Sequence, residues 1–196
     1  MIMSKPFEFG GLHHLALVCK DMQRTVDFYT NILGMNLNKG FDLDGGYGQH
    51  FFFDMGDGQE LAFFWFNDAH SAQPGVASAA NLVASGNGTI SSAHGSMNHL
   101  AFSVSKDKID GYRQELVSRG VDCSEVVNHD DVITGDEKRT SDMPTDKTWL
   151  RSFYFFDPDG IMLEFCATLS QGVQVADSPV NEKGIKENGQ LIMGTV

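Results

Sequence analysis

The chain has 196 residues, of which 41% are hydrophobic, enough for the core of one domain or of two packed half-size modules. Its formal net charge of −12 argues against nucleic acid or an anionic membrane as a partner, because binding phosphates requires a basic surface. Cys19, Cys123 and Cys166 are too few and too scattered for a disulfide framework, and no apolar run suits a signal peptide or a membrane span, so we expect a cytoplasmic protein.

Residues 1–66 predict a first module with the element order βαβββ. A strand-like run over 12–19 leads to Asp21, a candidate helix N-cap, and apolar residues then recur at helical spacing until Gly34. This pattern predicts one amphipathic helix. Three further strand-like runs are separated by glycine-rich turns, at 35–40, 47–55 and 60–66.

Residues 98–169 predict a second module with the same order. Its helix is expected around 107–119 and ends at Gly120, with four residues on its buried face: Ile109, Tyr112, Leu116 and Val117. Its strands are expected at 98–104, 121–127, 150–156 and 161–167. The last two are joined by a turn at 157–160.

Three segments lie outside the repeat. Residues 67–97 are rich in Ser, Ala, Gly and Asn and are too long for a simple connection, so they form a linker or a lid over a site. Residues 128–147 are a polar insertion in the second module and are expected to be a surface loop. The tail over 170–196 is expected to wrap the surface or a partner subunit, or to fray.

The clearest repeat is a histidine at the head of the first strand in each module. His14-Leu-Ala-Leu opens the first, and His99-Leu-Ala-Phe opens the second. Because side chains alternate along a strand, Ala16 and Ala101 share a face with the histidine of their own module. These small neighbours leave room for a metal and a ligand.

Each module also closes on a strand with a carboxylate, Glu60 or Glu164. Glu164 lies in an apolar run, where a carboxylate is costly unless it is paired or bound to a cation. Glu60 could instead be the polar end of a turn. If both point inward with His14 and His99, four donors meet between two curved sheets, a set that suits Zn, Ni, Co, Mn or Fe(II) rather than Ca or Mg.

The other histidines and the Phe-rich strands are expected to be mainly structural. His13 should point away from His14 by strand alternation, and among the remaining histidines His94 is the one expected to approach the site. Aromatic residues at strand spacing are more often core than ligand-binding, and about two-thirds of them are expected to pack under the helices.

The two histidine motifs, the Val26-Asp-Phe-Tyr helix and Asp157-Pro-Asp-Gly-x-x-x-Glu164 together resemble the vicinal oxygen chelate superfamily over roughly residues 10–168. That superfamily includes glyoxalase I, extradiol dioxygenases, methylmalonyl-CoA epimerases, and fosfomycin and bleomycin resistance proteins. The resemblance implies an α+β fold in which paired βαβββ modules form a cupped mixed sheet around one divalent metal that chelates neighbouring oxygens of a small molecule. It also implies a homodimer, although pairing of the modules within one chain fits the sequence equally.

The resemblance leaves three functions open. We favour narrowly a glyoxalase-like lyase or isomerase with His14, Glu60, His99 and Glu164 on the metal and one of the two glutamates moving a proton. The alternative is an Fe(II) extradiol dioxygenase that uses His14, His99 and Glu164, with Tyr154 as a hydrogen-bond donor. A metal-independent binding protein of the bleomycin-resistance type is the third, although such proteins typically lack these ligands.

Overall fold

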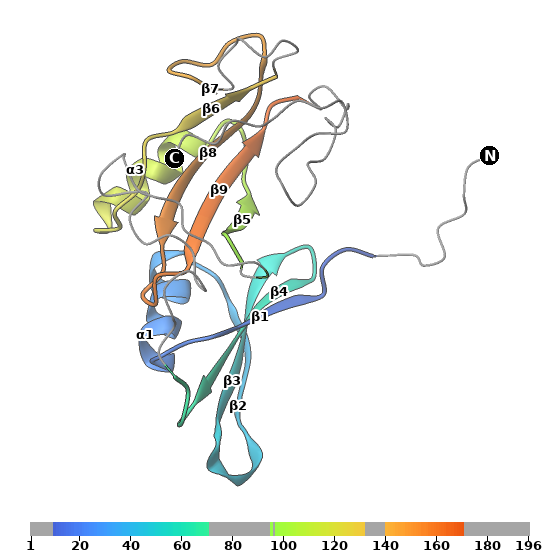
Figure 1. Ribbon diagram of the computed structural model, residues 1–196, viewed down its shortest axis with the longest axis vertical. Coiled ribbons are helices and arrows are strands. Elements are labelled where there is room, and N and C mark those ends of the chain that lie inside the picture. Colours follow the sequence, from blue (N-terminus) through green and yellow to red (C-terminus); the bar gives the residue numbers. More distant parts are fainter. Residues whose placement is uncertain (1–9, 71–94, 96, 132–139, 171–196) are drawn as a thin grey trace, which may run out of the picture.

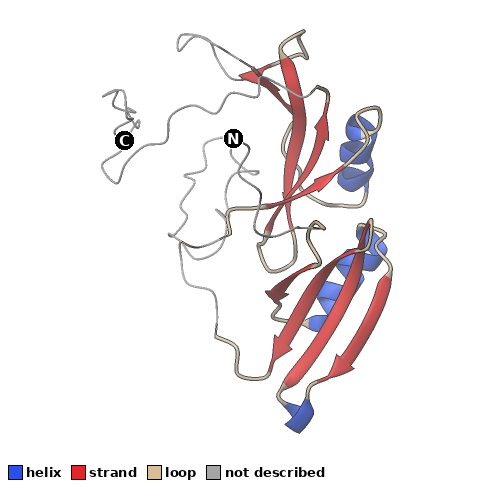
Figure 2. Cartoon of the chain, turned by 90° about the vertical axis from the view of Figure 1, so that its right-hand side faces the viewer, coloured by secondary structure: helices blue, strands red, loops and turns tan. Residues whose placement is uncertain are grey.

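The computed structural model describes residues 10–70, 95, 97–131 and 140–170, and the structural statements below concern these residues. The fold is α+β, with two mixed sheets and few helices (Figure 1). The predicted order βαβββ is confirmed in the first module, whereas the second module has an additional short strand before its last two strands. The two sheets lie one above the other along the long axis of the molecule (Figures 1 and 2).

The first sheet has the strand order β1-β4-β3-β2, with β1 parallel to β4 and the other neighbours antiparallel. Its exposed edge strand β1 carries His14. The elements of this module are β1 (His14–Val18), α1 (Met22–Val26), η1 (Asp27–Ile32), β2 (Leu37–Asp42), η2 (Asp44–Gly46), β3 (Gly48–Gly56) and β4 (Gln59–Phe66).

The predicted first helix is two consecutive segments. Asp21 is its N-cap, as predicted, since its Oδ1 accepts the backbone N–H of Arg24 at 3.1 Å. From Asp27 the chain widens into a π-helix, whose last bond runs from the Leu33 N–H to the Phe28 carbonyl. Gly34 then ends the helix with φ of +75°.

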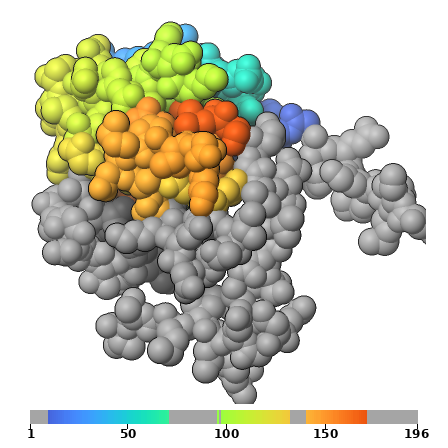
Figure 3. All heavy atoms as spheres, turned by 90° about the horizontal axis from the view of Figure 1, so that it is seen from above, coloured from blue at the N-terminus to red at the C-terminus, as the bar shows by residue number. Residues whose placement is uncertain are grey.

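The second sheet has the order β5-β9-β8-β6-β7, and β5 is again an edge strand parallel to its neighbour. In the view from above, the described residues of the second module, coloured from green to orange-red, lie next to one another (Figure 3). The elements are β5 (Leu100–Ser103), α3 (Ile109–Ser118), β6 (Val127–Asp130), β7 (Thr140–Ser141), β8 (Thr148–Phe156) and β9 (Met162–Thr168).

Three expectations for this module are wrong. The strand predicted at 121–127 is an irregular segment with one isolated bridge, and the sheet strand β6 begins at Val127, inside the segment expected to be a surface loop. Asn128 is only 2% exposed because its amide is satisfied by the Ser141 carbonyl and the Arg151 guanidinium, each at 2.9 Å. Val117, expected to be inward, is 47% exposed.

The modules are joined by a few specific contacts as well as by apolar packing. The buried hydroxyl of Tyr29 donates to Oδ2 of Asp157 at 3.2 Å, and Oδ1 of Asp157 accepts the N–H groups of Asp159 and Ile161. Burial raises the pKa of Asp157 to about 6, against the lowering effect of those N–H groups. The Lys20 N–H also crosses the boundary to Oδ2 of Asp159, at 2.9 Å.

No helix within the described ranges is long and apolar enough to cross a bilayer.

Candidate metal centre

The first candidate pair is His14 with Glu60. The parallel register places the two residues side by side on β1 and β4, so their side chains share one face. This face is open, because His14, Ala16 and Val18 are exposed while the alternate residues Leu15 and Leu17 pack on the core.

Two neighbours hold the first pair. The Asn38 amide donates to Oε1 of Glu60 at 3.0 Å, and the Nδ1 atoms of His13 and His14 lie 2.8 Å apart. The expectation that His13 points away is therefore wrong: His13 precedes β1, so strand alternation does not apply to it. Contact at Nδ1 leaves Nε2 of His14 as the atom that can bind a metal.

The second candidate pair is His99 with Glu164, which are in direct contact. Nε2 of His99 lies 3.0 Å from Oε2 of Glu164, a carboxylate only 5% exposed. Nδ1 of His99 lies 2.7 Å from Oδ1 of Asn98, an oxygen that can only accept, so Nδ1 carries the hydrogen. Two acceptor atoms therefore face each other, an arrangement that needs a proton or a metal cation between them, and this donor set fits a divalent metal.

Tyr154 lies beside this second pair. It is the register partner of Glu164 on β8, and its ring centre is 5.5 Å from that of His99. Burial, together with the negative charge of Glu164, raises the pKa of Tyr154 to about 12, against the lowering effect of the Ser152 hydroxyl. At neutral pH the phenol keeps its proton and can donate a hydrogen bond.

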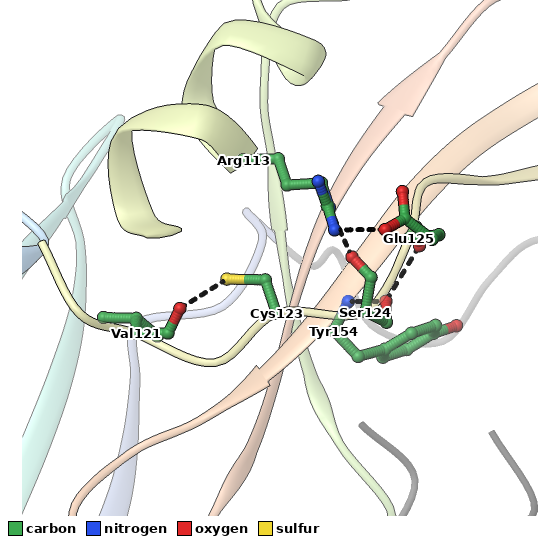
Figure 4. Close-up of polar contacts among 6 residues, drawn as sticks. All are labelled: Arg113, Val121, Cys123, Ser124, Glu125 and Tyr154. Atoms are coloured by element: carbon green, nitrogen blue, oxygen red, sulfur yellow. Dashed lines mark hydrogen bonds and ion pairs between the residues drawn. The ribbon is translucent and has the colours of Figure 1, made fainter. Parts of the chain in front are cut away.

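The backbone of Tyr154 is held from the side of α3 (Figure 4). Its N–H donates to the Ser124 hydroxyl at 2.9 Å, and its carbonyl accepts the Ser124 N–H at the same distance. Arg113 in turn donates from Nε to the Ser124 carbonyl at 2.6 Å and pairs with Glu125. The phenol is thus presented by a fixed strand and not by a loop.

The registers of the two sheets show that the carboxylates are not equivalent. Ala16 pairs with Ala62 in the first sheet, whereas Ala101, two residues after His99, pairs with Glu164 in the second. If the two histidines are superposed, the counterpart of Glu164 is therefore Ala62, and Glu60 lies two residues before that position. By the same logic Phe52, the partner of Ala62 on β3, corresponds to Tyr154.

The two pairs do not converge within one chain. In the part of the chain that the structure describes, no three His, Cys, Asp or Glu side chains are placed to hold one metal ion. Each module therefore presents half of a candidate site on its own sheet. A cavity of about 710 Å³ lies beside Gln49 and Trp65, on the opposite face of the first sheet from His14, so it is not the space between the pairs.

Sequence reasoning missed the side chains that support the candidate ligands, and it missed His50. His50 lies in β3 on the face that carries His14, and the alternation of the strand predicted at 47–55 could have indicated this. No sequence signal pointed to Asn38 and Asn98, because their roles depend on tertiary contacts. His94 lies outside the described residues.

The chain matches the family model described as the Glyoxalase/Bleomycin resistance protein/Dioxygenase superfamily over residues 11–165. Similar solved structures include a glyoxalase family protein from Enterococcus faecalis, 22% identical (81% of this chain, 98% of that one, TM-score 0.53). A glyoxalase/dioxygenase from Nostoc punctiforme is 22% identical (84% and 95%, TM-score 0.51). A mutant of the fosfomycin resistance protein FosX from Listeria monocytogenes, complexed with Mn(II) and 1S,2S-dihydroxypropylphosphonic acid, is 20% identical (85% and 98%, TM-score 0.51).

Proposed function

The chain belongs to the glyoxalase/bleomycin resistance protein/dioxygenase superfamily, and from this premise we propose that it is a divalent-metal-dependent enzyme of the extradiol dioxygenase type. The observation that carries the proposal is the register, which gives Glu164 the counterpart Ala62 and so favours three ligands, His14, His99 and Glu164. Two imidazoles and one carboxylate leave three positions on an octahedral Fe(II), enough for two oxygens of a catechol and for O2.

The surrounding residues supply what ring cleavage needs. Bound Fe(II) would bring catechol and O2 together and carry electrons between them. Glu60, beside His14, is the proposed acceptor for a proton that the catechol loses on binding, and Tyr154 donates a hydrogen bond from a phenol that keeps its proton. Both atoms of O2 enter the ring-opened product as one ring C–C bond breaks, so the reaction needs no further reductant.

A lyase or isomerase is the second candidate, because Glu60 is held beside His14 by Asn38 in a position to act as a fourth ligand or a base. In that reaction Glu60 takes a proton from the carbon next to a carbonyl and returns it to the neighbouring carbon, with no change of oxidation state overall and no O2.

Replacing Glu60 by Ala tests whether Glu60 is a fourth metal ligand, a role that only the lyase or isomerase candidate allows. If Glu60 is a base and not a ligand, we expect Fe(II) affinity within about threefold of wild type, whereas loss of a ligand weakens metal binding by about 100-fold or more. Anaerobic metal titration against a chromophoric chelator measures this, with the exposed Glu115→Ala as the matched control. Metal-dependent turnover of the wild-type protein without O2 uptake would contradict the dioxygenase proposal and support the lyase.

We further propose a homodimer in which the first sheet of each chain faces the second sheet of its partner. The support is that His14 with Glu60 and His99 with Glu164 each form half a donor set, and the halves do not meet within the described part of one chain. A symmetric pair of chains brings two complete sets together.

Mixing two inactive variants tests this arrangement. A chain with both His14→Ala and Glu60→Ala is expected to complement a chain with both His99→Ala and Glu164→Ala, because one site of each mixed dimer then has all its ligands. After co-refolding, about one quarter of the wild-type number of metal sites should return, as measured by metal content and sedimentation. If the modules pair within one chain, the mixture stays empty.

A further inference from the structure

The cavity of about 710 Å³ on the helix side of the first sheet takes no part in the proposed metal chemistry. Three of its lining residues form a row across neighbouring strands: Asp42 on β2 is the register partner of Gln49 on β3, which is the partner of Trp65 on β4. Neighbouring strands are about 5 Å apart, so this polar row is about 10 Å long. Residues 20–23, at the start of α1, also line the cavity. Its volume is within the range of small-molecule sites, about 300–1,000 Å³.

The polar row offers hydrogen-bonding groups that are already held in place. The Gln49 amide donates to Oδ1 of Asp42 at 3.0 Å. This bond leaves Oδ2 of Asp42 and the side-chain carbonyl of Gln49 as acceptors, and the second amide hydrogen as a donor. Among the described residues nothing accepts from the indole N–H of Trp65, and this nitrogen is not sealed in the core. The row therefore has both donors and acceptors left for a ligand.

The charges and the donors of the cavity decide which class of ligand fits. Asp21 and Asp42 line it, and the net charge of the protein is −12, so an anion is opposed. A simple cation would satisfy the carboxylates but would leave the donors of Trp65, Gln49 and Lys20 without acceptors. A hydroxyl group both donates and accepts. A neutral ligand with several hydroxyl groups can therefore pair with every group of the polar row.

The indole of Trp65 adds a requirement for an apolar surface on the ligand. One side of this residue packs on the core of the protein, and the rest of it is half-buried at the cavity. An indole has a flat apolar face and a polar edge. A sugar ring is complementary to it, because its faces carry C–H groups and its rim carries hydroxyl groups.

We propose that this cavity binds a carbohydrate, with one sugar ring on the indole of Trp65 and its hydroxyl groups hydrogen-bonded to Gln49 and Asp42. The polar row lies on the opposite face of the sheet from His14. Binding of a sugar here therefore requires no metal, and the inference is independent of the proposed function.

Heteronuclear NMR of the full-length protein tests the inference through the indole N–H signals. The chain has two tryptophans, so Trp149, on β8 of the second module, is an internal control, and Trp65→Phe assigns the two signals. The probes are methyl glucoside, methyl galactoside, methyl mannoside and N-acetylglucosamine. At least one is expected to shift the Trp65 signal to saturation, with a Kd on the order of a few millimolar. The Trp149 signal should stay in place, and the Kd should be the same with and without Zn(II).

Two replacements in the polar row test the contacts. Gln49→Ala removes hydrogen bonds to the sugar and the support of Asp42, so Kd should rise at least about tenfold. Asp42→Asn keeps an acceptor without its charge, so Kd should rise about fivefold. Gln114→Ala, exposed on α3, is the matched control and should bind as wild type does. Thermal unfolding of each variant shows whether the fold is retained.

Each other outcome overturns the inference. One is that the Trp65 signal stays in place with every sugar up to about 100 mM. Another is an equal Kd in folded Gln49→Ala and in Gln114→Ala, which places the sugar elsewhere. A shift with tetramethylammonium chloride and none with the sugars assigns the cavity to cations. Binding that is lost when Zn(II) is removed assigns the sugar to the metal centre and leaves the proposed metal site intact.

Discussion

Replacing Glu164 by Gln is expected to weaken divalent-metal binding by at least about 100-fold while leaving the metal-free fold intact. Gln keeps the size of the side chain, and its amide can donate to Nε2 of His99, so the 3.0 Å contact no longer needs a proton or a cation. The charge removed is a nearly buried one. Stability without metal should therefore be equal to that of wild type or higher by about 1 kcal/mol.

The measurement pairs a metal titration with thermal unfolding in the presence and absence of metal. Asp110→Asn is the matched control. Asp110 lies on α3, away from both candidate pairs, and its replacement removes one carboxylate from the ion pair with Arg151 of β8. The wild type and this control should gain thermal stability with metal, and Glu164→Gln should gain none. Wild-type metal affinity in Glu164→Gln would remove this residue from the ligand set.

Asp157 is expected to make the protein less stable as pH rises from about 4 to above 6. Burial raises its pKa to about 6, so between its ordinary value and that value the folded chain binds a proton that the unfolded chain has lost. The free energy of unfolding therefore decreases with rising pH in this window, by up to about 3 kcal/mol. Above the window, the ionised carboxylate stays buried at that cost.

Two replacements separate this charge from the hydrogen bonds of the residue. Asp157→Asn keeps an oxygen for the N–H groups of Asp159 and Ile161, so it should flatten the pH dependence. Asp157→Ala leaves the fully buried Tyr29 hydroxyl and both N–H groups without their acceptor and should cost about 3 kcal/mol. Urea unfolding from pH 4 to 8 measures both, with the exposed Asp122→Asn as control. A wild-type pH profile in Asp157→Asn would refute the role of this carboxyl.

Local patterns predict the elements of this fold where side chains alternate between an apolar and a polar face. The strand β1 is such a case, with Leu15 and Leu17 against the core and His14 outward. The pattern fails at β6, because the buried positions of that strand are held by Asn128 and Asp130, which are stable inside only through hydrogen bonds from distant residues. From the local sequence alone, these polar residues predict a loop.

The candidate ligands could be predicted from the sequence. Whether the two glutamates occupy equivalent positions in their modules could not. Repetition of a histidine motif points to His14 and His99, and an apolar setting points to Glu164. Whether Glu60 is the counterpart of Glu164 depends on how β1 pairs with β4 and β5 with β9, and register is a property of the assembled sheet. A displacement of two residues keeps Glu60 on the same face and moves it away from the equivalent position.

The paired registers also bear on how this protein could have diversified. Each position of the sheet exists twice, and two of these duplicated positions now carry unrelated chemistry: Ala62 against Glu164, and Phe52 against Tyr154. Once one copy of a duplicated unit retains a carboxylate and a phenol, mutations in the other copy no longer remove them. An ancestral duplication therefore lets the positions of Ala62 and Phe52 in the first module change freely while the second module keeps Glu164 and Tyr154.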